Sequence, residues 1–190
     1  MPFFSYLEDQ AVVGDIVTKN RRLYRHLSKV TSDIMSVRSP LSRGDREMIA
    51  AYVSGLNQCQ FCFGGHSVAA QAFGLSEDFF DSLLSDLDTA PVNEKMRSLL
   101  RYIRKLTLTP EKLTQADYDD VIAVGWDEQA LEDAIAVVCL FKFWNAMADG
   151  HGLEPPSQEY RQQLAKIVYN VGYRPMRANI FALLRKLKLR

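Results

Sequence analysis

The segment from Asp127 to Asp149 places the strongest constraint on how this chain folds. It contains the apolar run 134–141 (Ala-Ile-Ala-Val-Val-Cys-Leu-Phe) and has no glycine or proline. A helix over this range is apolar around nearly its whole circumference, so other elements must enclose it. The segment therefore predicts a central helix packed inside a bundle of other helices.

The rest of the chain supplies those other helices. Apolar residues recur at steps of three and four, strand signals are weak, and no Asn-Gly or Asp-Gly turn lies between two alternating runs. The sequence therefore predicts an all-α fold. We expect an irregular arm over 1–19, then helices over Asn20 to before Pro40 (buried face Leu23, Leu27, Val30, Ile34), Ser42–Gly55, Cys59–Gly74, from Ser76, Pro91–Leu106, Thr109–Gly125, Ser157–Asn170 and Pro175–Leu189.

The composition of the chain indicates which partners and which cellular location to expect. Basic and acidic residues number 23 each, so the balance gives no reason to expect a nucleic-acid partner. The start of the chain lacks a basic region followed by an apolar run, and no stretch is long enough to span a membrane. We therefore expect no membrane partner and a cytoplasmic location, where a close cysteine pair is catalytic or metal-binding more often than structural.

Chemistry-bearing residues cluster between Glu47 and His66. Cys59 and Cys62 are separated by two residues, His66 follows Cys62 by four, and Glu47 precedes Cys59 by twelve. On a helix, both sulfurs and the imidazole share one face. A helix start and a Cys-x-x-C neighbour lower thiol pKa values, so both cysteines are expected to be reactive. Glu47 can orient His66 for proton transfer, and a sulfenic acid on one cysteine can condense with the other thiol.

Two other functions are compatible with this sequence. One uses the helix face that carries Cys59, Cys62 and His66 to bind a metal or sense redox state, and the other makes no use of its chemistry. Cys59, Cys62 and His66 provide three zinc ligands, and the fourth would come from His26, His151 or Cys139, the last expected to be an inert buried thiol. A non-enzymatic zinc-binding or redox-sensing module is therefore the alternative function. The other is an oligomeric protein that binds a small ligand.

The glutamate followed by Cys-x-x-C-x-x-x-His resembles the AhpD-like alkylhydroperoxidase branch of the carboxymuconolactone decarboxylase family. Flanking support comes from Leu41-Ser42 before the glutamate and from the segment 143–150. The resemblance implies one AhpD-like domain over 1–190, with an N-terminal arm 1–39, a core about 40–152 and a C-terminal helical extension 153–190. It also implies a homo-oligomer, trimer or hexamer.

The resemblance further implies a thiol-dependent hydroperoxide reductase. Cys62 would attack the peroxide, Cys59 would resolve it, and His66 with Glu47 would relay protons. No bound cofactor is expected, since an external thiol donor, a lipoyl group or a thioredoxin-like protein, would restore the dithiol. Phe61 stands where the best-known members carry a second histidine. Asn145 and Asp149 are expected near the pocket or as helix-terminal polar residues, outside the catalytic set.

Two further features carry weaker expectations. The Gly64-Gly65 pair either allows a neighbouring helix to pack closely or leaves room for a substrate. After Glu159 the chain has eight basic and no acidic residues, and an apolar stripe runs through 176–187. We expect that basic amphipathic helix to pack on the protein or a neighbouring subunit, although such helices also bind anionic surfaces.

Overall fold

The computed structural model describes residues 1–173, and this part of the chain contains helices and no strand. The all-α prediction is confirmed. No helix within it is both long and apolar enough to cross a membrane. In chain order the elements are α1 (Val13–Lys19), α2 (Arg21–Ser36), α3 (Arg43–Leu56), α4 (Gln60–Ala72), α5 (Phe79–Ser85), α6 (Glu94–Leu108), the 3₁₀ turn η1 (Pro110–Lys112), α7 (Gln115–Ala123), α8 (Glu128–Gly150) and α9 (Gln158–Val171).

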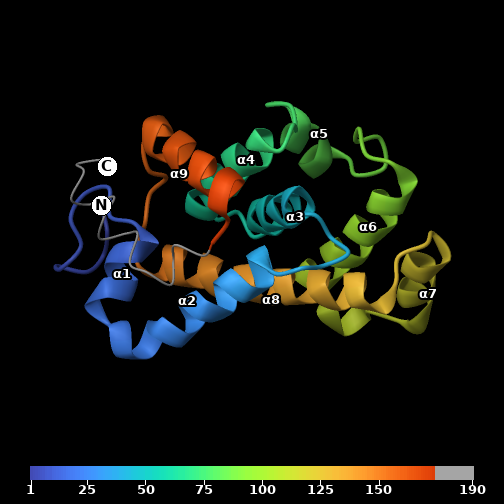
Figure 1. The fold of residues 1–190 in the computed structure, drawn as a ribbon, viewed down its shortest axis with the longest axis horizontal. Helices are drawn as coiled ribbons and strands as arrows, with labels where there is room; N and C mark the ends of the chain where they lie inside the picture. The colour runs from blue at the N-terminus through green and yellow to red at the C-terminus, as the bar shows by residue number, and fades with distance from the viewer. Residues whose placement is uncertain (174–190) are drawn as a thin grey trace.

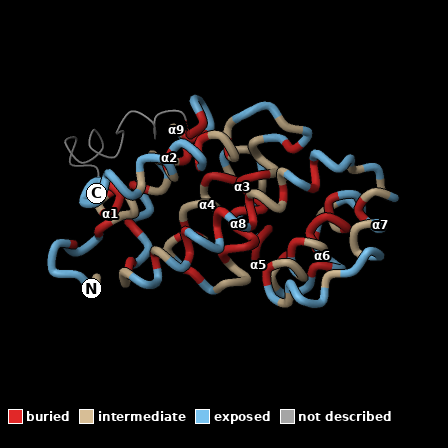
Figure 2. The backbone as a smooth tube through the Cα atoms, turned by 90° about the horizontal axis from the view of Figure 1, so that it is seen from below, coloured by how far each residue is buried: buried red, intermediate tan, exposed pale blue. Residues whose placement is uncertain are grey.

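The longest helix, α8, runs along the molecule and contacts α2, α3, α4 and α6 (Figure 1). The prediction of a central helix is therefore confirmed. Asp127 caps its first turn by accepting a hydrogen bond from the backbone N–H of Ala130 at 2.8 Å. Figure 2 shows buried backbone concentrated along α3 and α8. One strip of α8 nevertheless faces solvent, and Cys139 lies on it, so the expectation of a buried thiol there was wrong.

Helix α3 begins where the local sequence predicts. Ser42 accepts a hydrogen bond from the backbone N–H of Asp45 at 3.0 Å, and the Asp45 carboxylate accepts one from the Ser42 backbone N–H at 2.9 Å. This reciprocal pair satisfies two N–H groups that the start of a helix leaves open. Ile49 and Val53 of α3 are fully buried.

Helix α2 forms as expected, but its buried face was predicted wrongly. Leu23 is 60% and Val30 45% exposed, whereas Ser28 and Thr31 are buried. The two hydroxyls donate to the carbonyls of Tyr24 and Leu27 within their own helix, at 3.2 and 2.9 Å, so their burial leaves no polar group without a partner. The face of α2 that packs into the protein therefore differs from the predicted stripe of leucine, valine and isoleucine.

Four other boundaries differ from the predictions, since α6 begins at Glu94 rather than at Pro91. The arm expected over 1–19 ends in helix α1, whose Ile16 is buried and whose Asp15 accepts from the Val12 backbone N–H at 3.0 Å. The helix expected over Thr109–Gly125 is two elements, η1 and α7, because Thr114 breaks the run and caps α7 with Asp117. Helix α5 begins at Phe79 rather than at Ser76.

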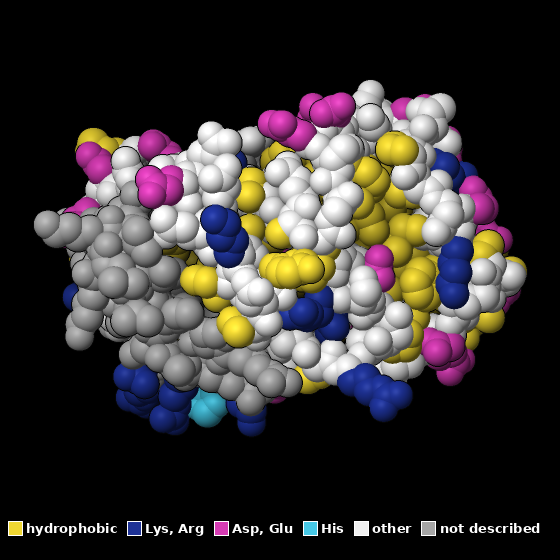
Figure 3. Space-filling model, turned by 45° about the horizontal axis from the view of Figure 1, so that its top comes forward, with side chains coloured by type: hydrophobic (Ala, Val, Ile, Leu, Met, Phe, Trp, Pro, Cys, Tyr) yellow, Lys and Arg dark blue, Asp and Glu magenta, His cyan; other side chains and the backbone are white. Residues whose placement is uncertain are grey.

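Helices α3 and α4 form a hairpin, and α9 packs on the other side of α4. The segments before α3 and after α8 therefore border the hairpin rather than trailing away from it (Figure 1). The helix predicted over Pro175–Leu189 lies outside the described residues. On the face drawn in Figure 3, basic and acidic side chains both occur, in keeping with the balanced charge.

Candidate functional site

The α3–α4 hairpin brings the four predicted site residues together. Glu47 lies on α3, Cys59 is the residue just before α4, Cys62 is in its first turn and His66 one turn further on. Nδ1 of His66 lies 2.7 Å from Oε2 of Glu47. The carboxylate is therefore beside the cysteine helix, on the same side of the molecule.

The turn between the two helices positions Cys59. Gln58 has a positive φ of 59°, a left-handed conformation that reverses the chain over a short distance. The backbone N–H of Cys59 then donates to the carbonyl of Ser54 at 3.0 Å, and the Cys59 carbonyl accepts from Phe63 at 3.0 Å as α4 begins. Both sulfurs are thereby held at the positive end of α4.

The two thiols are reduced and differ in environment. Cys59 is fully buried, whereas Cys62 is 5% exposed. A hydrogen bond from the Cys59 thiol, together with the charge of His66, lowers the pKa of Cys62 against the opposing effect of burial. The same bond to Cys62 and burial raise the pKa of Cys59. The expectation of two activated thiols was therefore wrong for Cys59, because Cys59 is the donor of the hydrogen bond within the pair and keeps its proton.

His66 is held between a carboxylate and a phenol. Burial opposes the charge on its ring, but the attraction and hydrogen bond of Glu47 prevail, and the pKa of His66 is raised above 6.5. The Tyr173 hydroxyl lies 3.4 Å from the same Nδ1, and burial raises the pKa of Tyr173 well above its usual value. With Nδ1 directed at Glu47, the other ring nitrogen is left to exchange protons near Cys62.

Asn145 of α8 joins the site to the hairpin. Its side chain is buried, accepts from Asn57 Nδ2 at 2.8 Å and donates to Ser54 Oγ at 3.0 Å. Its backbone carbonyl accepts from the Cys59 thiol at 3.9 Å, and its side chain is close enough to Cys62 to help lower the pKa of that thiol. Asn145 therefore fixes the turn that carries the cysteines, a role the sequence left undecided.

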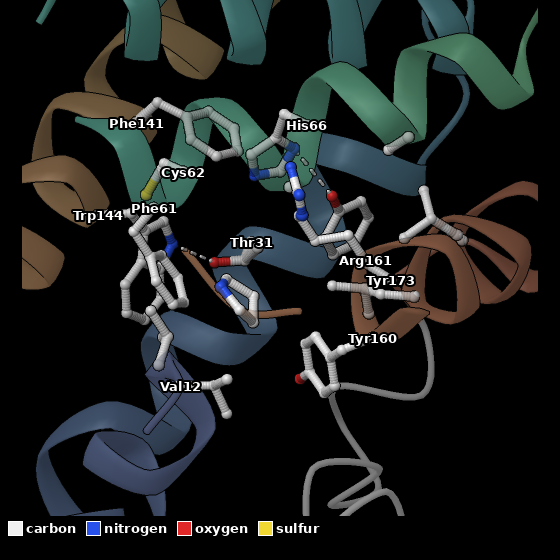
Figure 4. A pocket seen from close by; sticks show the side chains of 17 residues that line it. Val12, Thr31, Phe61, Cys62, His66, Phe141, Trp144, Tyr160, Arg161 and Tyr173 are labelled. Atoms are coloured by element: carbon white, nitrogen blue, oxygen red, sulfur yellow. Dashed lines mark hydrogen bonds between the residues drawn. The ribbon is translucent and has the colours of Figure 1, made fainter. Parts of the chain in front are cut away.

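A cavity of about 120 Å³ opens beside Cys62 and His66 (Figure 4). This volume is enough for a small organic molecule rather than a single water. The lining is mostly apolar and comes from the start of α1, from α2, α4, α8 and α9, from the connection between α8 and α9, and from the residues after α9. The lining residues are Val12, Val13, Thr31, Phe61, Cys62, Gly65, His66, Ala69, Phe141, Trp144, Pro156, Tyr160, Arg161, Leu164, Val168, Gly172 and Tyr173.

Both interpretations of the glycine pair apply, one to each residue. A Cβ on Gly64 would lie 3.1 Å from Nη1 of Arg161, so this glycine permits α9 to approach α4 closely. A Cβ on Gly65 would meet nothing within 4 Å, and Gly65 lines the cavity. Phe61, at the position discussed above for a second histidine, lines the cavity as well.

The structure gives no support to a zinc site in the described part of the chain. Within residues 1–173, no group of three or more His, Cys, Asp or Glu side chains is arranged to hold a metal ion. Cys139 and His26 are exposed on α8 and α2, while His151 bonds through Nδ1 to the Met147 carbonyl at 2.7 Å. Asp149, also exposed, is close enough to Cys59 to help raise its pKa.

Several cavity residues escaped the sequence analysis because they come from distant segments. Trp144 donates from Nε1 to Thr31 Oγ1 at 3.1 Å, which joins α8 to α2. Tyr173 is placed by its backbone N–H, which donates to Ser36 Oγ at 2.8 Å. A lone tyrosine or tryptophan gives no local signal, so only the folded chain reveals these neighbours.

Together the fold and site define an all-helical, AhpD-like protein with a dithiol and a histidine–glutamate pair at a small cavity. Residues 21–105 match the family described as the carboxymuconolactone decarboxylase family. The matched segment carries Glu47, both cysteines of the pair and His66, and the match supports the resemblance seen in the sequence.

Solved structures show the same fold. A peroxidase-related protein from Silicibacter sp. TM1040 is 25% identical, with a TM-score of 0.73 over 80% of this chain and 79% of that one. The alkylhydroperoxidase AhpD core of a peroxidase-related protein from Ralstonia eutropha JMP134 is 20% identical, with a TM-score of 0.71 over 80% and 78%. The debrominase Bmp8, bound to 2,3,4-tribromopyrrole, is 14% identical, with a TM-score of 0.67 over 83% and 81%.

Proposed function

We propose that the protein is a thiol-dependent hydroperoxide reductase in which Cys62 is the peroxidatic thiol and Cys59 the resolving one. Three observations support this order. Cys62 lines the cavity, its pKa is lowered, and the Cys59 thiol beside it is fully buried and stays protonated. A thiolate is the nucleophilic form of cysteine, so the accessible sulfur of lower pKa attacks first.

In the first step, the Cys62 thiolate attacks the terminal oxygen of the hydroperoxide. An S–O bond forms and the O–O bond breaks, which leaves a sulfenic acid on Cys62 and an alkoxide. The protonated ring of His66 gives its proton to the alkoxide, and the alcohol leaves. Glu47 keeps His66 protonated until this moment, because its carboxylate raises the pKa of the ring.

In the second step, the Cys59 sulfur attacks Cys62. The S–S bond forms, the S–O bond breaks, and the hydroxyl leaves as water with the proton from Cys59, for which the now neutral His66 provides a base. The two thiols have then supplied the two electrons that reduce the hydroperoxide. An external dithiol, a lipoyl group or a thioredoxin-like protein, returns the pair to its reduced form by exchange and becomes a disulfide itself.

The observation that carries this proposal is the pairing of two reduced thiols beside a histidine held 2.7 Å from a buried glutamate. The fold alone does not decide the reaction, since structures of this fold include both a peroxidase-related protein and a debrominase. A dithiol next to a proton donor is what reduction of a hydroperoxide requires.

The third cysteine provides a matched control for the test. On treatment with one equivalent of cumene hydroperoxide, we expect the titre of free thiols to fall from three to about one per chain. Cys62→Ser should abolish turnover with dihydrolipoamide, and Cys59→Ser should leave a sulfenic acid that dimedone traps on Cys62. Cys139→Ser changes an exposed thiol elsewhere on α8 and should retain full turnover. Turnover that survives in Cys62→Ser would refute the proposal.

The alternative of a zinc-binding or redox-sensing module is tested on the same preparation. Elemental analysis showing about one tightly held zinc per chain, with no peroxide turnover, would favour it. A homo-oligomer, trimer or hexamer, is part of the proposal and is measured by light scattering of the full chain.

A further inference from the structure

Arg161 introduces a charge into a cavity that is otherwise almost entirely apolar. It lies on α9 and is the only Lys, Arg, Asp or Glu among the described lining residues. Figure 4 shows its side chain reaching toward α4, on the wall that carries His66. The cavity is therefore apolar over most of its surface and carries a guanidinium at one point.

The guanidinium of Arg161, a half-buried residue, has few hydrogen-bond partners. Its Nε is buried and has no hydrogen-bond partner among the described residues. Nη1 makes one long contact, 3.5 Å to the carbonyl of Gly64, and no carboxylate of residues 1–173 forms an ion pair with Arg161. Buried polar groups are nearly always paired, because leaving one without a hydrogen bond costs free energy. A guanidinium that lines a cavity and has so few partners therefore points to a ligand that accepts hydrogen bonds from it.

Gly64 shapes the position of this charge. A Cβ at Gly64 would lie 3.1 Å from Nη1, 3.6 Å from Cδ and 3.8 Å from Cζ of Arg161. The Arg161 side chain therefore passes close to the backbone of Gly64, which is two residues from Cys62 in the sequence. An anionic group held by Arg161 keeps the remainder of a small molecule close to the reactive sulfur.

We propose that the substrate of this site is a small, mainly apolar hydroperoxide that carries a carboxylate, and that Arg161 binds the carboxylate. A planar guanidinium matches a carboxylate through two parallel hydrogen bonds, which a neutral polar group does not reproduce. Phe61 and Trp144 line the cavity around the apolar body. This inference rests on the proposed function for the reacting group, but the carboxylate site itself is testable without turnover.

Binding is measured by isothermal titration calorimetry on the full reduced chain with two unreactive probes of equal shape, 4-isopropylbenzoate and 4-isopropylbenzamide. We expect the carboxylate to bind about tenfold or more tightly than the amide, as for hydrogen bonds to charged groups. Arg161→Gln should remove this preference, and Arg161→Lys should keep part of it. Lys166→Gln removes the same charge from an exposed position on α9 and should leave the preference unchanged. Circular dichroism checks that each variant is folded.

Equal binding of the two probes, or a carboxylate preference that survives in Arg161→Gln, would overturn the inference. Steady-state kinetics with cumene hydroperoxide and its para-carboxylate derivative then separate the carboxylate site from the proposed reaction. We expect Arg161→Gln to raise KM for the carboxylate alone and to leave KM for the thiol reductant unchanged. A change confined to the KM of a carboxylate-bearing thiol would assign the anion to the reductant and refute the inference. No turnover with either peroxide, with the binding preference intact, would refute only the reaction.

Discussion

Replacement of Asn145 by alanine tests how the site is held. The change removes one hydrogen bond from Asn57 at 2.8 Å and one to Ser54 at 3.0 Å. The partly buried Asn57 amide loses its acceptor, and the buried Ser54 hydroxyl keeps only its bond to the Ala50 carbonyl. A hydrogen bond contributes about 1 kcal/mol net, and each polar group left buried without a partner costs about 1–3 kcal/mol. We therefore expect Asn145→Ala to lower the free energy of unfolding by about 2–4 kcal/mol.

The measurement is urea unfolding of reduced protein, supported by thermal melting, where this loss corresponds to a fall in Tm of about 5–15 °C for a chain of this size. Asn170→Ala is the matched control, because Asn170 is exposed and bonds only to the Lys166 carbonyl; it should cost about 0.5 kcal/mol or less. The variant should also raise the pKa of Cys62, followed by thiolate absorbance, since a bond from Asn145 is among the effects that lower it. A loss below about 0.5 kcal/mol would show that the Asn145 bonds do not hold the turn.

Two other substitutions test the proton role of Glu47 and the space beside Gly65. Glu47→Gln removes the carboxylate that raises the pKa of His66, so the alkaline limb of the profile of kcat/KM against pH should move to lower pH; an unmoved limb would contradict the proton role. Because the folded pKa of His66 lies above the unfolded 6.5, the pairing stabilises the fold fully below 6.5 and is lost as pH rises through the folded value. The difference in unfolding free energy between wild type and Glu47→Gln should therefore shrink with rising pH. Gly65→Ala should raise unfolding free energy by up to about 1 kcal/mol, since its Cβ meets nothing within 4 Å, yet should lower kcat/KM for cumene hydroperoxide more than for hydrogen peroxide. Equal losses for the two peroxides would contradict a cavity that selects by size.

Features encoded within one turn of helix were predictable from the sequence. The cap formed by Ser42 and Asp45 placed the start of α3, and the spacing from Cys59 to His66 placed the sulfurs and the imidazole on one helix. The short distance between Glu47 and His66 depends on packing between two adjacent helices. That packing could be predicted because only a short connection joins the two helices.

Features that depend on distant segments were not predictable. Apolar spacing identified α2 but not its buried face, because Ser28 and Thr31 satisfy their hydroxyls within the helix and can be buried where Leu23 is not. The pKa values of the two cysteines diverge mainly through the hydrogen bond from the Cys59 thiol to Cys62, whose direction the spacing does not encode. Tyr173 reaches His66 across 107 positions of sequence, and nothing local to it indicates this contact.

The source of the cavity walls has a consequence for how such a protein diversifies. The reacting groups come from one hairpin between Glu47 and His66, whereas Val12, Tyr160 and Arg161 are contributed by helices near the two ends of the described chain. Exchanges in those outer helices alter which compounds enter without disturbing the thiols. Related proteins can therefore change substrate while keeping the same catalytic residues, and grafting α9 between relatives is a direct route to new selectivity.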